Sequence, residues 1–162
     1  MLEEITRIAY YECMEFIGRN RYDDDCMIVA IHNALIAAGK PSTYERVKNI
    51  CVRHGWYRKG KGFQCKFLGE AFKRFGVEIK PVPEDMTTKE YFRNVVENNK
   101  SYFIVSGARY EDSLGHAMVA TKGEIGVKIV NSLWYGRGWK TISKDINSGF
   151  LKIYAVEIER SI

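Results

Sequence analysis

The chain has 162 residues, of which 46% are hydrophobic and 28% charged, and its formal net charge is +5. This length suits one domain with its own hydrophobic core, and the composition is typical of a globular protein. The apolar runs are too short to cross a bilayer, and the first residues lack the basic start and cleavage site of a secretory signal. We therefore expect one cytoplasmic domain over residues 1–162 that does not interact with membranes.

The first half of the sequence predicts helices. Apolar residues recur at helical spacing in each segment, and glycine follows the segments. Ser42 or Thr43 can cap the third helix. The second segment is apolar on nearly every side, so we expect it to be buried. The predicted helices cover residues 2–17, 25–38, 43–54 and 64–75, and a loop covers residues 55–62.

The second half predicts mainly strands. A short strand over residues 77–82 precedes a helix that begins at Thr87 or Thr88 and ends near residues 98–99. Because helices lead and strands joined by short turns follow, we expect an α+β fold with an antiparallel sheet. The helical half covers about residues 1–76 and the sheet half about residues 77–162. The later strands are expected over residues 101–107, 115–121, 126–134 and 151–158.

The cysteines are scattered, and a core of this size needs no disulfides, so we expect free thiols. Cys51, His54 and Cys65 have a spacing compatible with zinc, but no clear fourth ligand accompanies them. No phosphate-binding glycine pattern is present. The sequence therefore predicts neither a metal site nor a cofactor.

The densest basic cluster is "WYRKGKGFQCK", residues 56–66. Such a cluster is typical of a solvated loop, and a positive surface can also favour acidic partners or nucleic acid. No nucleic-acid-binding motif accompanies it. We therefore interpret it as a solvated loop and do not expect nucleic acid as a partner.

Three residues occupy positions where they could form a catalytic site. Cys26 begins the buried helix in "DDDCMIVAIHNALIAAGK", His116 begins a strand, and Asn131 lies late in the next strand. A helix N-terminus and an imidazolium both favour a reactive thiolate. A histidine can then transfer the proton, and a third polar group can orient its ring. These residues predict a Cys-His-Asn triad. His32 lies on another side of the same helix, and we interpret it as structural.

The order and setting of these residues resemble the papain-like cysteine peptidase fold. "GHAMVA" is similar to the family's His-Ala-Val stretch, and "IVNSLWYGRGW" to its Asn-Ser-Trp-Gly segment. The compact bacterial peptidases that trim Gly-Gly leader peptides look closest, over about residues 20–139, and the resemblance implies a peptide or protein substrate. The resemblance implies that Asn20 and the backbone N–H of Cys26 form the oxyanion hole. Either Asn131 or Ser132 would orient His116, and the amide of Asn131 is the better acceptor.

Other interpretations stay open. "DDDCMIVAI" also resembles ovarian-tumour-type deubiquitinases, in which an aspartate matching Asp23 shapes the oxyanion loop. The same residues could serve deamidation or acyl transfer on a host protein. A catalytically decayed papain-like module that binds a peptide or protein is the non-enzymatic hypothesis. Aspartates at residues 23–25 favour it, because acids cap a helix well but disfavour a nearby thiolate.

Overall fold

The structure of the chain is a computed structural model. The helix predicted over residues 2–17 lies outside the described residues, except for Ile17. The structure describes residues 17, 21–22, 24–81, 83–87, 90–91, 101–107, 116–123, 126–130 and 151–157.

Three α-helices form the first half of the described chain. They are α2 (Cys26–Ala37), α3 (Tyr44–Arg53) and α4 (Leu68–Arg74). A single 3-10 turn, η1 (Cys65–Phe67), precedes α4 and occupies the start of the helix predicted over residues 64–75. The Thr43 hydroxyl accepts a hydrogen bond from the Arg46 N–H at 3.1 Å, which confirms Thr43 as the cap of α3.

The three helices end in the same way. In each, a glycine with φ between 72° and 76° follows the last turn, and its N–H and that of the next residue bond back to carbonyls of that turn. In α2, Gly39 N–H donates to the Ile36 carbonyl and Lys40 N–H to the Leu35 carbonyl. This is the Schellman arrangement, which favours glycine because of its positive φ. The predicted glycine ends of these helices are confirmed.

The prediction of a loop over residues 55–62 is wrong in part. The chain there forms an antiparallel hairpin of β1 (Tyr57–Arg58) and β2 (Gly62–Phe63), in which Tyr57 pairs with Phe63. Gly60 and Gly62 both have positive φ, at 81° and 77°. Glycine supplies the turn at no steric cost, and strands of two residues are too short to produce an alternating pattern.

The described strands of the second half form one five-stranded sheet, together with no other strand of the described chain. Its strands are β3 (Ile79–Pro81), β4 (Ser101–Gly107), β5 (His116–Gly123), β6 (Gly126–Val130) and β7 (Leu151–Glu157). Their order is β3-β7-β4-β5-β6, and every described pair is antiparallel. Helices followed by an antiparallel sheet make this an α+β fold, as predicted.

The helix predicted after β3 begins at Thr87. The Thr87 hydroxyl accepts from the Glu90 N–H, and the Glu90 carboxylate accepts from the Thr87 N–H, both at 3.2 Å. These two reciprocal bonds form a capping box. They make Thr87, one of the two predicted start residues, the residue that caps this helix.

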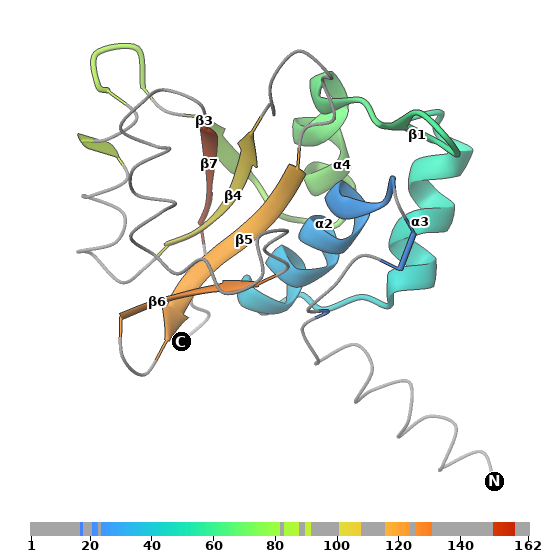
Figure 1. The fold of residues 1–162 in the computed structure, drawn as a ribbon, viewed down its shortest axis with the longest axis horizontal. Helices are drawn as coiled ribbons and strands as arrows, with labels where there is room; N and C mark the ends of the chain where they lie inside the picture. Colours follow the sequence, from blue (N-terminus) through green and yellow to red (C-terminus); the bar gives the residue numbers. More distant parts are fainter. Residues whose placement is uncertain are drawn as a thin grey trace, which may run out of the picture.

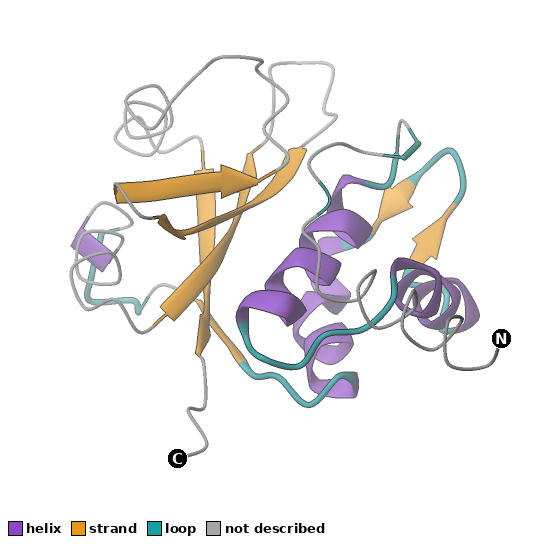
Figure 2. Cartoon of the chain, turned by 90° about the horizontal axis from the view of Figure 1, so that it is seen from below, coloured by secondary structure: helices purple, strands orange, loops and turns teal. Residues whose placement is uncertain are grey.

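Helix α2 lies between the sheet and the other helices (Figures 1 and 2). It packs on β5 and β4 on one side and on α3 on the other. From Met27 to Leu35 every residue is buried, as the apolar pattern predicts. Within the described part of the chain, no helix has the length and apolarity needed to cross a membrane. The rest of the core includes Val47, Trp56, Leu68, Phe72 and Val119.

Candidate functional site

The candidate site lies at the N-terminal end of α2. Cys26 is the first residue of this helix and is partly exposed, whereas the residues that follow it are buried. Helix α2 and strand β5 pack side by side, and they begin at the same end of the molecule (Figures 1 and 2). His116 is the first residue of β5. The fold therefore brings together the segments that carry two of the three predicted catalytic residues.

The remaining predicted site residues lie outside the described residues. These are Asn131, its alternative Ser132, the oxyanion residue Asn20 and Asp23. Strand β6 ends at Val130, which pairs with Val119 of β5. Since the two strands are antiparallel, β6 leads toward the end of the sheet where β5 begins.

Asp25 occupies the N-cap position of α2 but does not cap the helix with its side chain. Its carboxylate is fully buried and accepts hydrogen bonds from the Tyr44 hydroxyl at 2.6 Å and from the Arg21 N–H at 3.2 Å. The expectation that this acid caps the helix is therefore wrong. The reason is tertiary: the buried hydroxyl of α3 is a donor that competes with the N–H groups of α2.

Asp24 also turns to a neighbouring element. Its carboxylate accepts from the Tyr57 hydroxyl at 2.7 Å and from the Gly60 N–H at 2.5 Å, both in the β1–β2 hairpin. Burial opposes its ionisation, but these hydrogen bonds outweigh it and hold the pKa of this carboxyl below its usual value. Asp24 is therefore ionised at neutral pH and ties the hairpin to the segment before Cys26.

Two cations lie over tyrosine rings in this region. The guanidinium of Arg21 stacks over the Tyr44 ring, with 4.4 Å between its central carbon and the ring centroid. Lys48 sits 4.2 Å from the centre of the Tyr22 ring, and its charge favours the ionised form of Asp24. Lys48 therefore partly compensates the negative charge of Asp24.

The tyrosine partners remain protonated well above neutral pH. For both Tyr44 and Tyr57, burial followed by the hydrogen bond to an aspartate raises the pKa above the usual range of a phenol. Each phenol therefore acts as a donor. Sequence reasoning missed both residues, because their partners lie far along the chain: Tyr44 follows Asp25 by 19 positions and Tyr57 follows Asp24 by 33.

Two polar residues on α2 are structural. His32 and Asn33 are completely buried, which agrees with the structural interpretation of His32. The Asn33 side chain accepts from the Ile17 N–H at 2.8 Å and donates to the Ile17 carbonyl at 3.0 Å. This pair of bonds fixes the chain that leads into the site against the middle of α2.

The zinc-like spacing does not form a cluster among the described residues, which contain no group of three or more potential metal ligands. Cys51 is buried, and burial raises the pKa of its thiol to about 12. His54 stacks on Trp56 with 4.4 Å between the ring centroids. Cys65 is exposed.

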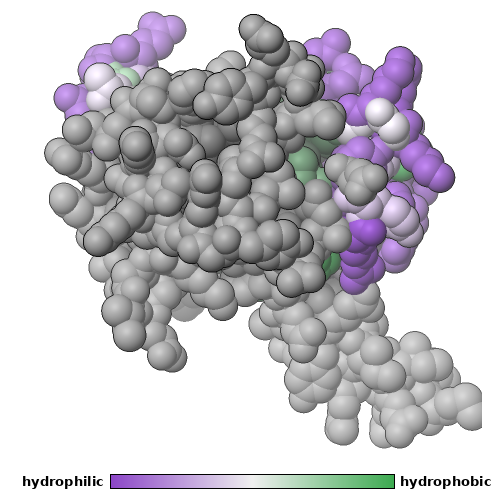
Figure 3. All heavy atoms as spheres, in the orientation of Figure 1, coloured by the Kyte–Doolittle hydropathy of each residue, from purple (hydrophilic) through white to green (hydrophobic). Residues whose placement is uncertain are grey.

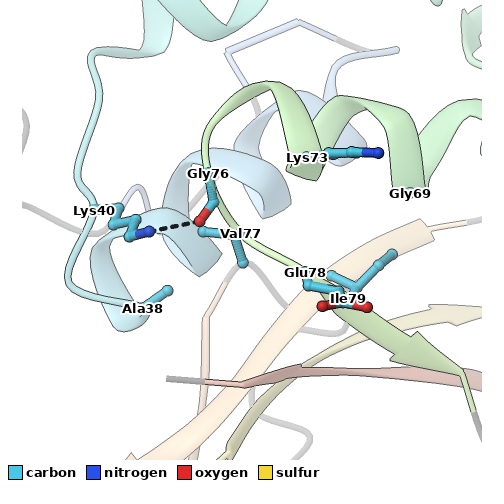
Figure 4. Close-up of a pocket in the computed structure, with 8 residues that line it drawn as sticks. All are labelled: Ala38, Lys40, Gly69, Lys73, Gly76, Val77, Glu78 and Ile79. Atoms are coloured by element: carbon cyan, nitrogen blue, oxygen red, sulfur yellow. Dashed lines mark hydrogen bonds between the residues drawn. The ribbon is translucent and has the colours of Figure 1, made fainter. Parts of the chain in front are cut away.

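A separate pocket of about 550 Å³ lies at the opposite end of α2 (Figure 4). Ala38 and Lys40 line it from the end of α2, and Lys73 lines it from α4. The Lys40 ammonium donates to the Gly76 carbonyl at 2.6 Å and so closes one side of the pocket. The described lining contains neither a cysteine nor a histidine, so the N-terminal end of α2 remains the candidate site for thiol chemistry.

No protein-family model matches this chain, and a search of curated proteins finds no match either.

Proposed function

We propose that this protein is a papain-like thiol amide hydrolase, a cysteine peptidase that acts on a peptide or protein. The observation that supports it best is the common end at which α2 and β5 begin, with Cys26 first in the helix and His116 first in the strand. A buried helix packed on an antiparallel sheet is also what the papain-like resemblance requires.

In the proposed reaction, the Cys26 thiolate attacks the carbonyl carbon of the scissile amide. The His116 imidazolium gives its proton to the departing amine, which leaves a thioester on Cys26. His116, now neutral, takes a proton from water as the water attacks the thioester. The acid product leaves and the thiolate and imidazolium are restored.

The start of α2 suits the negative charge that develops in this reaction. Asn20 and the backbone N–H of Cys26 are the proposed oxyanion donors, and one such donor contributes about 3 kcal/mol to transition-state stabilisation. The Asp25 carboxylate is bonded to Tyr44 and the Arg21 N–H, so it does not compete for the N–H groups of the first helical turn. The positive end of the helix dipole then favours an anion at Cys26.

Asn131 is the proposed orienting residue. It directly follows β6, which leads toward the end of the sheet where His116 lies. The proposal requires the His116 imidazole to reach Cys26 from this end of the sheet. It also requires the strand to depart from regular alternation near its first residue, because Val119, three residues further along, is buried in the core with α2 and alternation would place the two side chains on opposite faces.

Covalent labelling tests the nucleophile. A peptide electrophile directed at thiols should label Cys26 in a Cys65→Ser background, which removes the exposed competing thiol. Peptide mapping by mass spectrometry identifies the labelled cysteine. Cys26→Ala in the same background should abolish labelling and leave the circular dichroism spectrum unchanged. Labelling of equal extent on another cysteine contradicts the proposal.

The same residues suit hydrolysis, as in a peptidase or a deubiquitinase, and also deamidation or acyl transfer. The mass of a modified target separates these reactions, because hydrolysis adds water across a bond whereas deamidation raises the mass by about one unit. The absence of labelling at Cys26, together with tight peptide binding, is the result expected of a binding module whose site has decayed.

A further inference from the structure

We infer that the β1–β2 hairpin, residues 57–63, selects acidic peptide segments for the site at Cys26. This inference rests on the proposed function, because it names the class of substrate for that site. The function itself gives no role to the basic cluster that the hairpin carries. The positions, exposure and partners of these cations supply the argument.

The cations of the hairpin are exposed, and the described acid that contacts the hairpin, Asp24, bonds to the Tyr57 hydroxyl and the Gly60 N–H and not to a hairpin cation. Arg58, Lys59 and Lys61 are all exposed, and no ion pair reaches their side chains within the described part of the chain. The sequence from residue 53 to residue 69 contains no acidic residue. Figure 3 shows the hydrophilic surface over α3 and this hairpin, on the side away from the sheet. Unpaired cations on one hairpin create a positive potential that attracts acidic groups.

The hairpin is held beside Cys26. Asp24, two residues before Cys26, accepts hydrogen bonds from Tyr57 and Gly60, and β2 packs against α2. The Gly62 Cα lies so close to the Asp24 carbonyl that an added Cβ would sit 3.4 Å from that oxygen. Asp24 therefore holds the hairpin and offsets part of its positive charge, but the three cations outnumber it and are exposed at the same end of α2 as the thiol.

The surroundings favour a peptide over a nucleic acid. Binding of single strands depends on aromatic rings on which bases stack. The aromatics in and beside the hairpin are largely covered: Trp56 is 7% exposed, Tyr57 is 3% exposed with its hydroxyl bonded to Asp24, and Phe63 is partly buried against the core. Tyr22 is 55% exposed, but Lys48 lies over its ring. An acidic peptide, by contrast, can bind through its charged side chains alone, because the hairpin supplies the opposite charge.

Two matched peptide electrophiles test the inference, one with glutamates beside the reactive group and one with glutamines. In the Cys65→Ser background at low salt, Cys26 should react about three- to tenfold faster with the glutamate peptide. Lys59→Gln with Lys61→Gln should remove this preference. Lys73→Gln with Arg74→Gln, exposed cations on α4, changes the net charge equally and should retain it. Salt at about 1 M should also abolish the preference, because it shortens the screening length to about 3 Å.

Binding of the glutamate peptide without its electrophile to the Cys26→Ala variant, followed by fluorescence anisotropy, separates the two proposals. Binding that depends on Lys59 and Lys61 supports the inference even if Cys26 proves unreactive, in which case only the proposed function fails. Equal reaction rates for the two peptides overturn the inference. So does an equal loss of preference in the α4 variant, or tighter binding of a single-stranded oligonucleotide than of the glutamate peptide.

Discussion

The two ends of α2 are built differently. At the C-terminal end, the N–H groups of Gly39 and Lys40 bond to helix carbonyls, and a single glycine makes this possible. At the N-terminal end, the residue in the capping position turns its carboxylate to α3. The C-terminal end is completed by backbone alone, whereas the N-terminal end depends on side chains from α3 and the hairpin.

The difference leaves the N-terminal end of α2 without a side-chain cap. A side-chain cap on α2 would stabilise the helix by about 1 kcal/mol. Asp25 occupies the position of such a cap and forgoes it for a buried bond to Tyr44. An end without a side-chain cap suits an anionic nucleophile and oxyanion, because the helix dipole then acts on them directly.

The largest change in the free energy of unfolding is expected from Tyr44→Phe, which breaks the hydrogen bond to Asp25 at the N-terminal end of α2. It removes the hydroxyl donor of a fully buried carboxylate and should lower the free energy of unfolding by about 1.5–3 kcal/mol. Tyr57→Phe makes the same chemical change beside Asp24, which is less buried, so water can replace the donor and the loss should be smaller. Urea denaturation of both variants measures the difference, and equal losses would contradict the importance of burial at Asp25.

A smaller effect is expected at the other end of α2 from Gly39→Ala. The residue has φ 73° and open space around a new Cβ, so the cost is backbone strain alone, about 1–2 kcal/mol. Gly69→Ala in α4 is the matched control, because that glycine is helical and its added Cβ also meets nothing. It should stabilise the protein by about 0.5–1 kcal/mol. The unfolding temperature should therefore fall in Gly39→Ala and rise in Gly69→Ala. Shifts of the same sign would contradict the claim that backbone strain at Gly39 sets the cost.

The smallest effect is expected from Asp24→Asn, and it depends on pH. The folded-state pKa of Asp24 lies below its ordinary value of 3.8, so the ionised form is favoured in the folded state. Its contribution is therefore complete above pH 3.8 and is lost as the pH falls through the lower folded-state value. At neutral pH the variant should be less stable by at most about 1 kcal/mol, because the site is partly exposed. Urea denaturation at several pH values should show that the stability difference between the variant and the unmodified protein shrinks in acid. A difference that stays constant with pH would contradict a lowered folded-state pKa for Asp24.

Local patterns predicted most of the elements. The apolar residues of α2, the glycines that end the helices and the strand-like runs of the second half all appear in the structure. The positions of Cys26 and His116 as first residues of their elements also follow from these patterns. Each of these features depends on residues close in sequence, which is why the sequence was sufficient.

Long-range partners could not be predicted. The insertion of β7 between β3 and β4 pairs segments that are distant in the chain, and no local pattern encodes that order. The competition between Tyr44 and the helix for the Asp25 carboxylate is likewise tertiary. Strand β5 is apolar on both faces after His116, so the burial of Val119 does not follow from alternation.

The pH dependence of Cys26 alkylation tests the central claim most directly. In the Cys65→Ser background, the rate of reaction with iodoacetamide at Cys26 should stay high below pH 7, because a neighbouring imidazolium sustains the thiolate. His116→Ala should remove this low-pH reactivity and leave the free energy of unfolding nearly unchanged. An alkylation rate that rises only near pH 8.5 in both proteins, as for an ordinary thiol, would contradict the pairing of Cys26 with His116.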